Sequence, residues 1–126
     1  ADLTHRIASA VSARLKPDDE VVCQLGIGRH VDHVTVRRAA ELLGRPLHYT
    51  ADIPYLFNRP EQLKPHTAGM KKKVERVSRA GSRSWKEAVL AYESQIPMLF
   101  KNQQTARKLI NRHLSEFGGM PIWRKV

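Results

Sequence analysis

The order of periodic segments predicts an α/β fold in which helices flank a mostly parallel sheet. A helical repeat over 2–15 is followed by a short apolar run at 20–25, a second helical repeat, and another short run at 47–50. Helices that alternate with short apolar strands are typical of parallel sheets, because both faces of such sheets are covered. We therefore expect a Rossmann-like, three-layer arrangement within a single domain spanning residues 1–126.

The first helix is predicted by apolar residues at every fourth position over 3–15, and Asp2 is suited to cap its N-terminus. A polar turn at 16–19 ends this helix. The strand at 20–25 follows and contains Cys23, the only cysteine of the chain, so no internal disulfide can form. The apolar neighbours of this cysteine predict a buried structural thiol rather than a nucleophile.

The middle of the chain predicts a loop, a helix, a strand and a long connection. Gly26 and Gly28 loosen the backbone before the second helix, whose apolar stripe ends at Gly44. The strand at 47–50 comes next. The segment 51–69 contains three prolines and few periodic positions, and it is expected to be a functional or mobile loop.

The last third of the chain predicts one strand and two helices. We expect an edge strand over 70–78, then a helix that starts at a capping box on Ser84 and ends at Pro97. A further apolar stripe predicts a helix over 106–117. Trp123 is interpreted as a residue that docks a charged C-terminal tail.

Composition places the chain among globular proteins and leaves its partners open. Hydrophobic residues make up 41% of the chain and charged residues 27%, with a net charge of +10. The cations are dispersed apart from a cluster at 71–73 that is followed by Arg76, Arg79 and Arg83. The alternative function is therefore a basic module that binds nucleic acid or another polyanion through residues 71–83. Nucleic acid is disfavoured by the lack of a base-reading motif. The sequence has no signal-peptide pattern, and no apolar run approaches the roughly 20 residues of a membrane span. A cytoplasmic location is expected.

The chemistry of the chain is concentrated in His30, Asp32 and His33, at the predicted start of the second helix. Positions three apart on a helical turn share a face, so one imidazole can bind a metal while the other faces the same cavity. Asp32 can accept the second N–H of an imidazole, which would orient the ring and raise its basicity. The alternative interpretation is that the two histidines are ordinary surface or helix-capping residues.

Five segments of the chain form a recognisable series: LGIGRHVDH at 25–33, VRRAA at 36–40, DIPY at 52–55, YESQ at 92–95, and GG with IWR at 118–124. In sequence and in order they resemble the N-acetylglucosaminyl-phosphatidylinositol de-N-acetylase family, also called PIG-L/LmbE-like. The HxDH element with its glycine-rich lead-in is the most specific of them.

The resemblance implies a zinc-dependent deacetylase that hydrolyses the amide of N-acetyl sugars, such as N-acetylglucosaminides or related glycolipids. By this analogy His33 is a Zn²⁺ ligand, and His30 either protonates the leaving amine or stabilises the oxyanion. Asp32 would orient His30. Arg29, beside the motif, and Tyr55 are candidate substrate contacts.

One departure from the family matters, because its upstream motif Ala-His-Pro-Asp-Asp-Glu supplies the other zinc ligands and the general base. The similar stretch 16–20 does not replace it: Lys16 stands at the histidine position, the stretch precedes its strand, and it lies too close to His30. We expect a solvated acidic turn there. One histidine does not complete a three-ligand zinc site.

We therefore expect this chain to be the C-terminal portion of the deacetylase domain, inactive alone. The N-terminal portion would be truncated, cleaved off, present as a separate chain, or lost in a protein that kept a binding role. Core surface exposed by its absence could also drive homo-oligomerisation.

Overall fold

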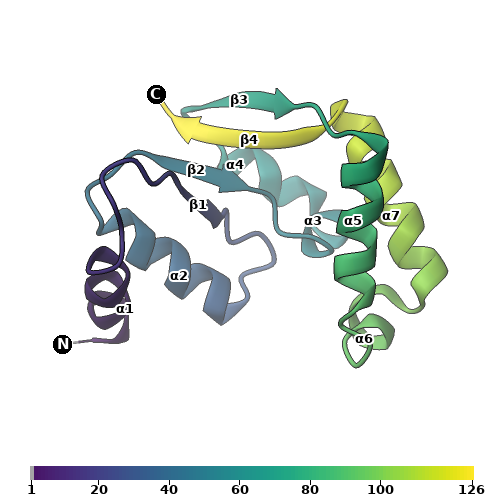
Figure 1. Ribbon diagram of the computed structural model, residues 1–126, viewed down its shortest axis with the longest axis horizontal. Helices are drawn as coiled ribbons and strands as arrows, with labels where there is room; N and C mark the ends of the chain where they lie inside the picture. Colours follow the sequence, from purple (N-terminus) through teal and green to yellow (C-terminus); the bar gives the residue numbers. More distant parts are fainter. Residues whose placement is uncertain (1) are drawn as a thin grey trace. The chain divides into compact units, whose positions relative to one another are not determined.

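The computed structural model describes residues 2–126, and its helices and strands alternate in the first half of the chain (Figure 1). The chain forms two compact units, one running to Lys72 and including Ile122–Val126, the other Lys73–Pro121. In chain order the elements are α1 Leu3–Ser12, β1 Val21–Gln24, α2 Val31–Glu41, β2 Leu47–Thr50, α3 Tyr55–Asn58, the 3₁₀ turn η1 Pro60–Gln62, α4 Leu63–His66, β3 Met70–Glu75, α5 Arg79–Leu90, α6 Ile96–Phe100, α7 Gln103–Phe117 and β4 Met120–Lys125.

The four strands form one open sheet in the order β1-β2-β4-β3. Strands β1 and β2 are parallel, with Cys23 opposite Tyr49, whereas β2 and β4 are antiparallel, with Tyr49 opposite Trp123. The α/β class is therefore confirmed, but the sheet is mixed rather than mostly parallel, because the last strand returns in the opposite direction. The three-layer arrangement and the single-domain boundary stay predictions.

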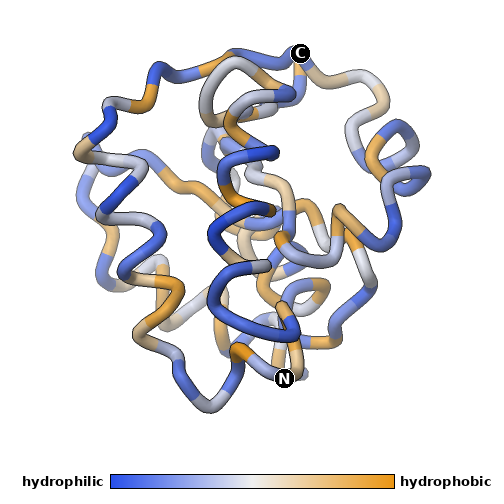
Figure 2. The backbone as a smooth tube through the Cα atoms, turned by 90° about the vertical axis from the view of Figure 1, so that its right-hand side faces the viewer, coloured by the Kyte–Doolittle hydropathy of each residue, from blue (hydrophilic) through white to orange (hydrophobic). Residues whose placement is uncertain are grey.

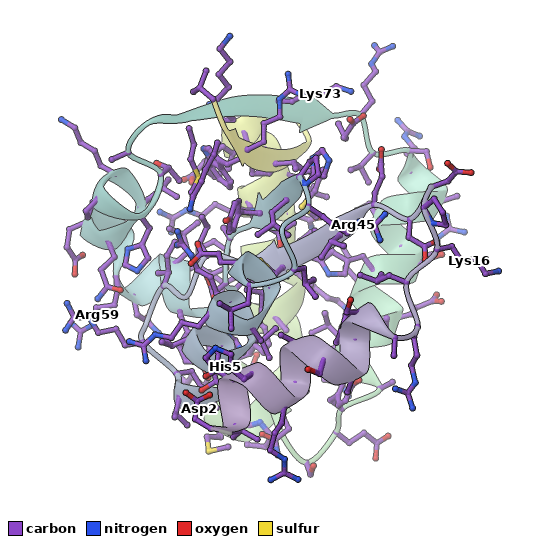
Figure 3. The ribbon with its side chains drawn as sticks, turned by 90° about the vertical axis from the view of Figure 1, so that its left-hand side faces the viewer. Asp2, His5, Lys16, Arg45, Arg59 and Lys73 are labelled. Carbon is purple, nitrogen blue, oxygen red and sulfur yellow. The ribbon has the colours of Figure 1, made fainter. Side chains whose placement is uncertain are left out.

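The first unit packs α1 and α2 near β1, and its core contains Cys23, Leu25, Ile27 and Tyr49. Helix α1 begins as predicted, since Asp2 Oδ1 accepts a hydrogen bond from the backbone N–H of His5 at 3.0 Å. Figure 3 shows these two side chains together at the start of the helix. Cys23 is buried, and burial raises the pKa of its thiol to about 11, so the thiol stays protonated at neutral pH.

The acidic stretch before β1 is a turn, as predicted. The carboxylate of Asp19 accepts a hydrogen bond from the backbone N–H of Lys16 at 2.7 Å. One guanidinium nitrogen of Arg45 donates to the carbonyl groups of Lys16, Pro17 and Asp19 at 2.8–2.9 Å (Figure 3). These contacts hold the backbone of the turn, and its acidic side chains are exposed.

The second unit is built on α5, α6 and α7, whose buried residues Leu90, Ile96, Phe100 and Ala106 form one cluster. The predicted helix start at Ser84 is wrong. Helix α5 begins six residues earlier, because Ser78 Oγ accepts the N–H of Gly81 at 2.9 Å. The predicted end at Pro97 is also wrong, since a proline in the first turn of a helix loses no intrahelical bond and here it opens α6.

Two further segments differ from the sequence prediction. The C-terminal tail is strand β4, in which Pro121 and Trp123 are buried and alternate with half-buried residues. The connection 51–69 contains α3, η1 and α4. The strand predicted at 70–78 is confirmed as β3, although it ends at Glu75.

Hydrophobic residues are spread in short stretches along the chain (Figure 2). Hydrophobic (orange) and hydrophilic (blue) segments alternate along the helices, as expected where one side of each helix is buried and the other is exposed to solvent. Among residues 2–126, no helix has the length and apolar character needed to cross a membrane.

Candidate functional site

The candidate site is organised by a buried carboxylate beyond the parallel strands β1 and β2. Because these two strands are parallel, their carboxyl ends lie at the same end of the sheet, and the loops that follow them meet there. Asp52 follows β2 and is fully buried. Its Oδ1 accepts hydrogen bonds from the backbone N–H groups of Gly26 and Ile27, both at 2.9 Å. These two donors fix the carboxylate and join the two loops.

The other oxygen of this carboxylate holds a histidine. His33 lies on the first turn of α2, and its Nδ1 is 2.7 Å from Asp52 Oδ2. A carboxylate can only accept, so a neutral His33 ring carries its proton on Nδ1. Nε2, on the other side of the ring, then has a free lone pair. The side chain is 22% exposed, which leaves part of the ring accessible.

His30 precedes the same helix and caps it. Its Nδ1 accepts a hydrogen bond from the backbone N–H of Asp32 at 3.2 Å. The carboxylate of Asp32 is 81% exposed and 3.9 Å from the same nitrogen, beyond hydrogen-bonding distance. In this arrangement the backbone of Asp32, rather than its carboxylate, orients His30, and a neutral ring carries its proton on Nε2.

Three of the predicted site residues come together as a ring cluster. The ring centroids of His30 and His33 are 5.1 Å apart, and the ring of Tyr55 lies 5.6 Å from His33 and 6.1 Å from His30. Gly28 makes this packing possible: its φ is +85°, and a Cβ added there would lie 2.7 Å from Tyr55 Cβ. Its N–H donates to Gln62 Oε1 at 2.8 Å. Tyr55 therefore forms one wall of the site.

Arg29 directly precedes His30 in the chain and is exposed. It borders a hollow of about 670 Å³ together with Gly26, Val31, Arg38 and His66. His66 is fixed by its Nδ1, 2.8 Å from the carbonyl oxygen of Gln62. The hollow is bordered by more cationic than anionic side chains, which suits an anionic group.

The donor set of this chain does not fit a zinc site by itself. Catalytic zinc has three protein ligands and an open position. Residues 2–126 contain no group of three histidine, cysteine or acidic side chains placed to hold a metal. The His33–Asp52 pair has the form of a metal-ligating histidine with its supporting carboxylate, so it would supply one ligand.

Asp52 is the central carboxylate of this candidate site, and the sequence prediction assigned it no role. The sequence did contain a signal for such a role. An acidic residue that directly follows the second of two parallel strands lies at the carboxyl ends of the strands, where ligands bind in α/β folds. The basic cluster at 71–73 lies on β3 and is exposed, with Lys73 Nζ 2.8 Å from Glu75. Polyanion binding through this cluster stays a prediction.

The fold is similar to that of a known hydrolase. No protein-family model matches the sequence, and no curated protein matches it. A teicoplanin deacetylase, solved in its zinc-inhibited form, superposes with a TM-score of 0.75 at 20% sequence identity. The match covers 98% of this chain and 51% of that protein, so the chain spans about half the length of the structure it matches. At this level of identity the likeness establishes a shared fold.

Proposed function

We propose that this chain carries the histidine side of a zinc-dependent deacetylase site that hydrolyses the amide of N-acyl sugars, with N-acetylglucosaminides as the substrate class. The observation that carries the proposal is the His33–Asp52 pair. A carboxylate with no solvent exposure, held by two backbone donors, fixes a partly exposed imidazole. Burial of a carboxylate is costly, and its use to orient a partly exposed imidazole supports a functional role for that histidine.

The two histidines have different tasks in this proposal. The pairing with Asp52 leaves His33 Nε2 as a lone-pair donor. His30 has the opposite tautomer, so its Nε2–H can donate a hydrogen bond to the oxygen of the substrate amide. Charge develops on that oxygen when water adds to the carbonyl carbon, and fixed donors stabilise it.

The geometry of His30 favours oxyanion stabilisation over protonation of the leaving amine. An imidazolium carries protons on both nitrogens, and a proton on Nδ1 would face the backbone N–H of Asp32 that this nitrogen now accepts. We therefore assign His30 the role of hydrogen-bond donor. Tyr55, which packs against both rings, would contact the sugar.

The coordination of the zinc ion would be completed by ligands that the described residues do not supply. This chain would contribute His33, and Asp52 would orient that ligand. Loss of such a supporting carboxylate reduces metal affinity or activity by about 10–100-fold in other zinc sites.

The first test is hydrolysis of N-acetylglucosaminides by the full-length natural protein that contains this sequence, supplied with zinc. His33→Ala should abolish acetate release and lower the zinc content of the purified protein. His5→Ala is the control, because this exposed histidine on α1 is paired only with Asp2 and should leave both quantities unchanged. Zinc content that is the same in both variants would contradict the role of His33.

The second test reads the tautomer directly. Nitrogen NMR of His33 in the metal-free protein should show the proton on Nδ1. In Asp52→Asn the amide NH₂ would face Nδ1 while the amide oxygen keeps its backbone donors, so the proton should move to Nε2. Deacetylation should fall by about 100-fold with the fold retained. An unchanged tautomer in Asp52→Asn would contradict the proposal that Asp52 orients His33 for zinc binding.

A further inference from the structure

Arg37, on α2, connects the candidate site to the core of the first unit. Its Nη1 donates a hydrogen bond to the carbonyl oxygen of Leu25 at 2.7 Å, and its Nε donates to Glu41 Oε1 at 3.1 Å. The guanidinium also lies over the ring of Tyr49, 4.9 Å from the ring centroid. The side chain is 20% exposed. Two charge-assisted or strong hydrogen bonds and a cation–π contact therefore fix its position.

The carbonyl group that Arg37 holds belongs to the peptide that also bonds to Asp52. The C=O of Leu25 and the N–H of Gly26 are parts of one planar peptide group. Arg37 lies at the oxygen end of this group, and Asp52 Oδ1 accepts the hydrogen bond from its N–H at 2.9 Å. Because hydrogen bonds at the two ends of a peptide polarise each other, a cation at the oxygen makes the N–H a stronger donor to the carboxylate.

This series of contacts ends at the histidine of the candidate site. Asp52 Oδ2 is 2.7 Å from His33 Nδ1, so the peptide held by Arg37 is separated from the imidazole by one carboxylate. His33 and Arg37 are four positions apart on α2 and share a face of the helix. The orientation of the imidazole relative to its own helix thus depends on both of its supports, the helix backbone and the loop that Arg37 holds.

Glu41 fixes the guanidinium in turn. Its Oε1 accepts hydrogen bonds from Arg37, from the hydroxyl of Tyr49 at 3.1 Å and from Lys125 Nζ at 3.2 Å. Although burial raises the pKa of Glu41, the hydrogen bonds from Arg37 and Lys125 lower it below its ordinary value, so the carboxylate is ionised at neutral pH. Burial raises the pKa of Tyr49 to about 12, so its hydroxyl keeps the proton that it donates. The network therefore joins the loop at the site to β2 and β4.

We propose that Arg37 is a positioning residue of the candidate site: it holds the Leu25–Gly26 peptide so that Asp52, and through it His33, keep their geometry. Arg37 acts on the reaction only through this peptide and the carboxylate. Its effect on deacetylation rests on the proposed function, whereas its effect on the geometry of the Asp52–His33 pair does not.

Hydrogen exchange in the metal-free, full-length natural protein tests this role without substrate. Arg37→Gln should speed exchange at the amide of Gly26 by at least about tenfold, because the peptide loses its support. The amide of Leu25 is the internal reference: it bonds to the carbonyl oxygen of Thr50 at 2.9 Å and should change less than about twofold. Arg38→Gln makes the same charge change at the next, exposed residue and should leave both amides unchanged. Equal acceleration at Gly26 and Leu25 would indicate a general loss of stability and overturn the positioning role.

A second variant keeps the test decisive if Arg37→Gln does not fold. Glu41→Gln retains the length of the side chain and an acceptor oxygen, and it removes only the charge that holds the guanidinium of Arg37. Exchange at Gly26 should rise by about threefold. Unchanged exchange at Gly26 in this variant would overturn the proposal.

Kinetics separate positioning from substrate binding. In Arg37→Gln the kcat for hydrolysis of N-acetylglucosaminides should fall by about tenfold with KM unchanged, as expected for a residue that supports a metal ligand indirectly. A rise in KM at unchanged kcat would assign Arg37 to substrate binding and overturn the positioning role. If the full-length protein releases no acetate at all, the deacetylase assignment fails, while exchange at Gly26 still decides the role of Arg37.

Discussion

Two acidic segments lie at opposite ends of the parallel pair β1–β2, and only one of them belongs to the candidate site. Before β1, the carboxylate of Asp19 is exposed and bonds to the backbone N–H of Lys16 within its own turn. After β2, the carboxylate of Asp52 is fully buried and bonds to two loops and a histidine. The acidic composition of a segment therefore does not predict whether it takes part in the candidate site. Its position relative to the carboxyl ends of the strands does.

The largest expected effect comes from removing the buried carboxylate. Asp52→Ala leaves the N–H groups of Gly26 and Ile27 and the Nδ1 proton of His33 without their acceptor, and we expect a loss of about 3–5 kcal/mol in unfolding free energy. Urea denaturation measures it. Asp19→Ala, at the exposed turn, is the matched control and should cost less than about 1 kcal/mol. Equal losses in the two variants would remove the contrast between the two segments.

The second prediction concerns the glycine that brings the ring cluster together. Gly28→Ala places a methyl group 2.7 Å from Tyr55 Cβ and a side chain at a φ of +85°. Overpacking and left-handed strain together should cost about 3 kcal/mol in unfolding free energy. Gly44→Ala is the control, since its φ is also positive (+65°) but its Cβ would meet nothing within 4 Å. A similar loss at both positions would show that backbone strain alone is responsible.

Much of the site followed from local spacing. The sequence predicted the strand–loop–helix order around residues 21–41, and the structure places His30, His33 and Tyr55 in one cluster. Asp52 was assigned no role because it is 19 residues from His33, and the contact depends on the pairing of β1 with β2. Local patterns do not encode such pairings.

The errors in the predicted helices and strands have local causes. Ser78 and Ser84 both suit a helix cap, and sequence alone does not rank them. Strand β4 was missed because the segment is short and ends in two cations, so its alternation covers only four positions. Its antiparallel direction also changed the predicted sheet from mostly parallel to mixed.

A third, smaller effect tests the structural role of the turn before β1. Arg45→Met keeps the length of the side chain but removes the donors to three backbone carbonyl groups. We expect a loss of about 1–2 kcal/mol, because the hydrogen bonds are charge-assisted but exposed to water. Thermal unfolding measures the change. Arg59→Met, at an exposed arginine between α3 and η1, is the comparison and should have a smaller effect. In the full-length protein, Arg45→Met should leave deacetylation unchanged. Loss of deacetylation in this variant would indicate that the amino-terminal ends of β1 and β2 belong to the active site.

The smallest effect is expected at the acidic residue inside the motif itself. The carboxylate of Asp32 is 81% exposed and beyond hydrogen-bonding distance of His30, whose Nδ1 is held by the backbone N–H of residue 32. Asp32→Ala keeps that N–H, so NMR should still show the proton of His30 on Nε2, and stability should fall by about 0.5 kcal/mol through the lost charge at the helix N-terminus. His30→Ala removes the cap itself and should cost about 1 kcal/mol. If Asp32→Ala instead changes the tautomer of His30, the side chain of Asp32 orients the ring, and the motif contains a second carboxylate–histidine pair besides Asp52 and His33.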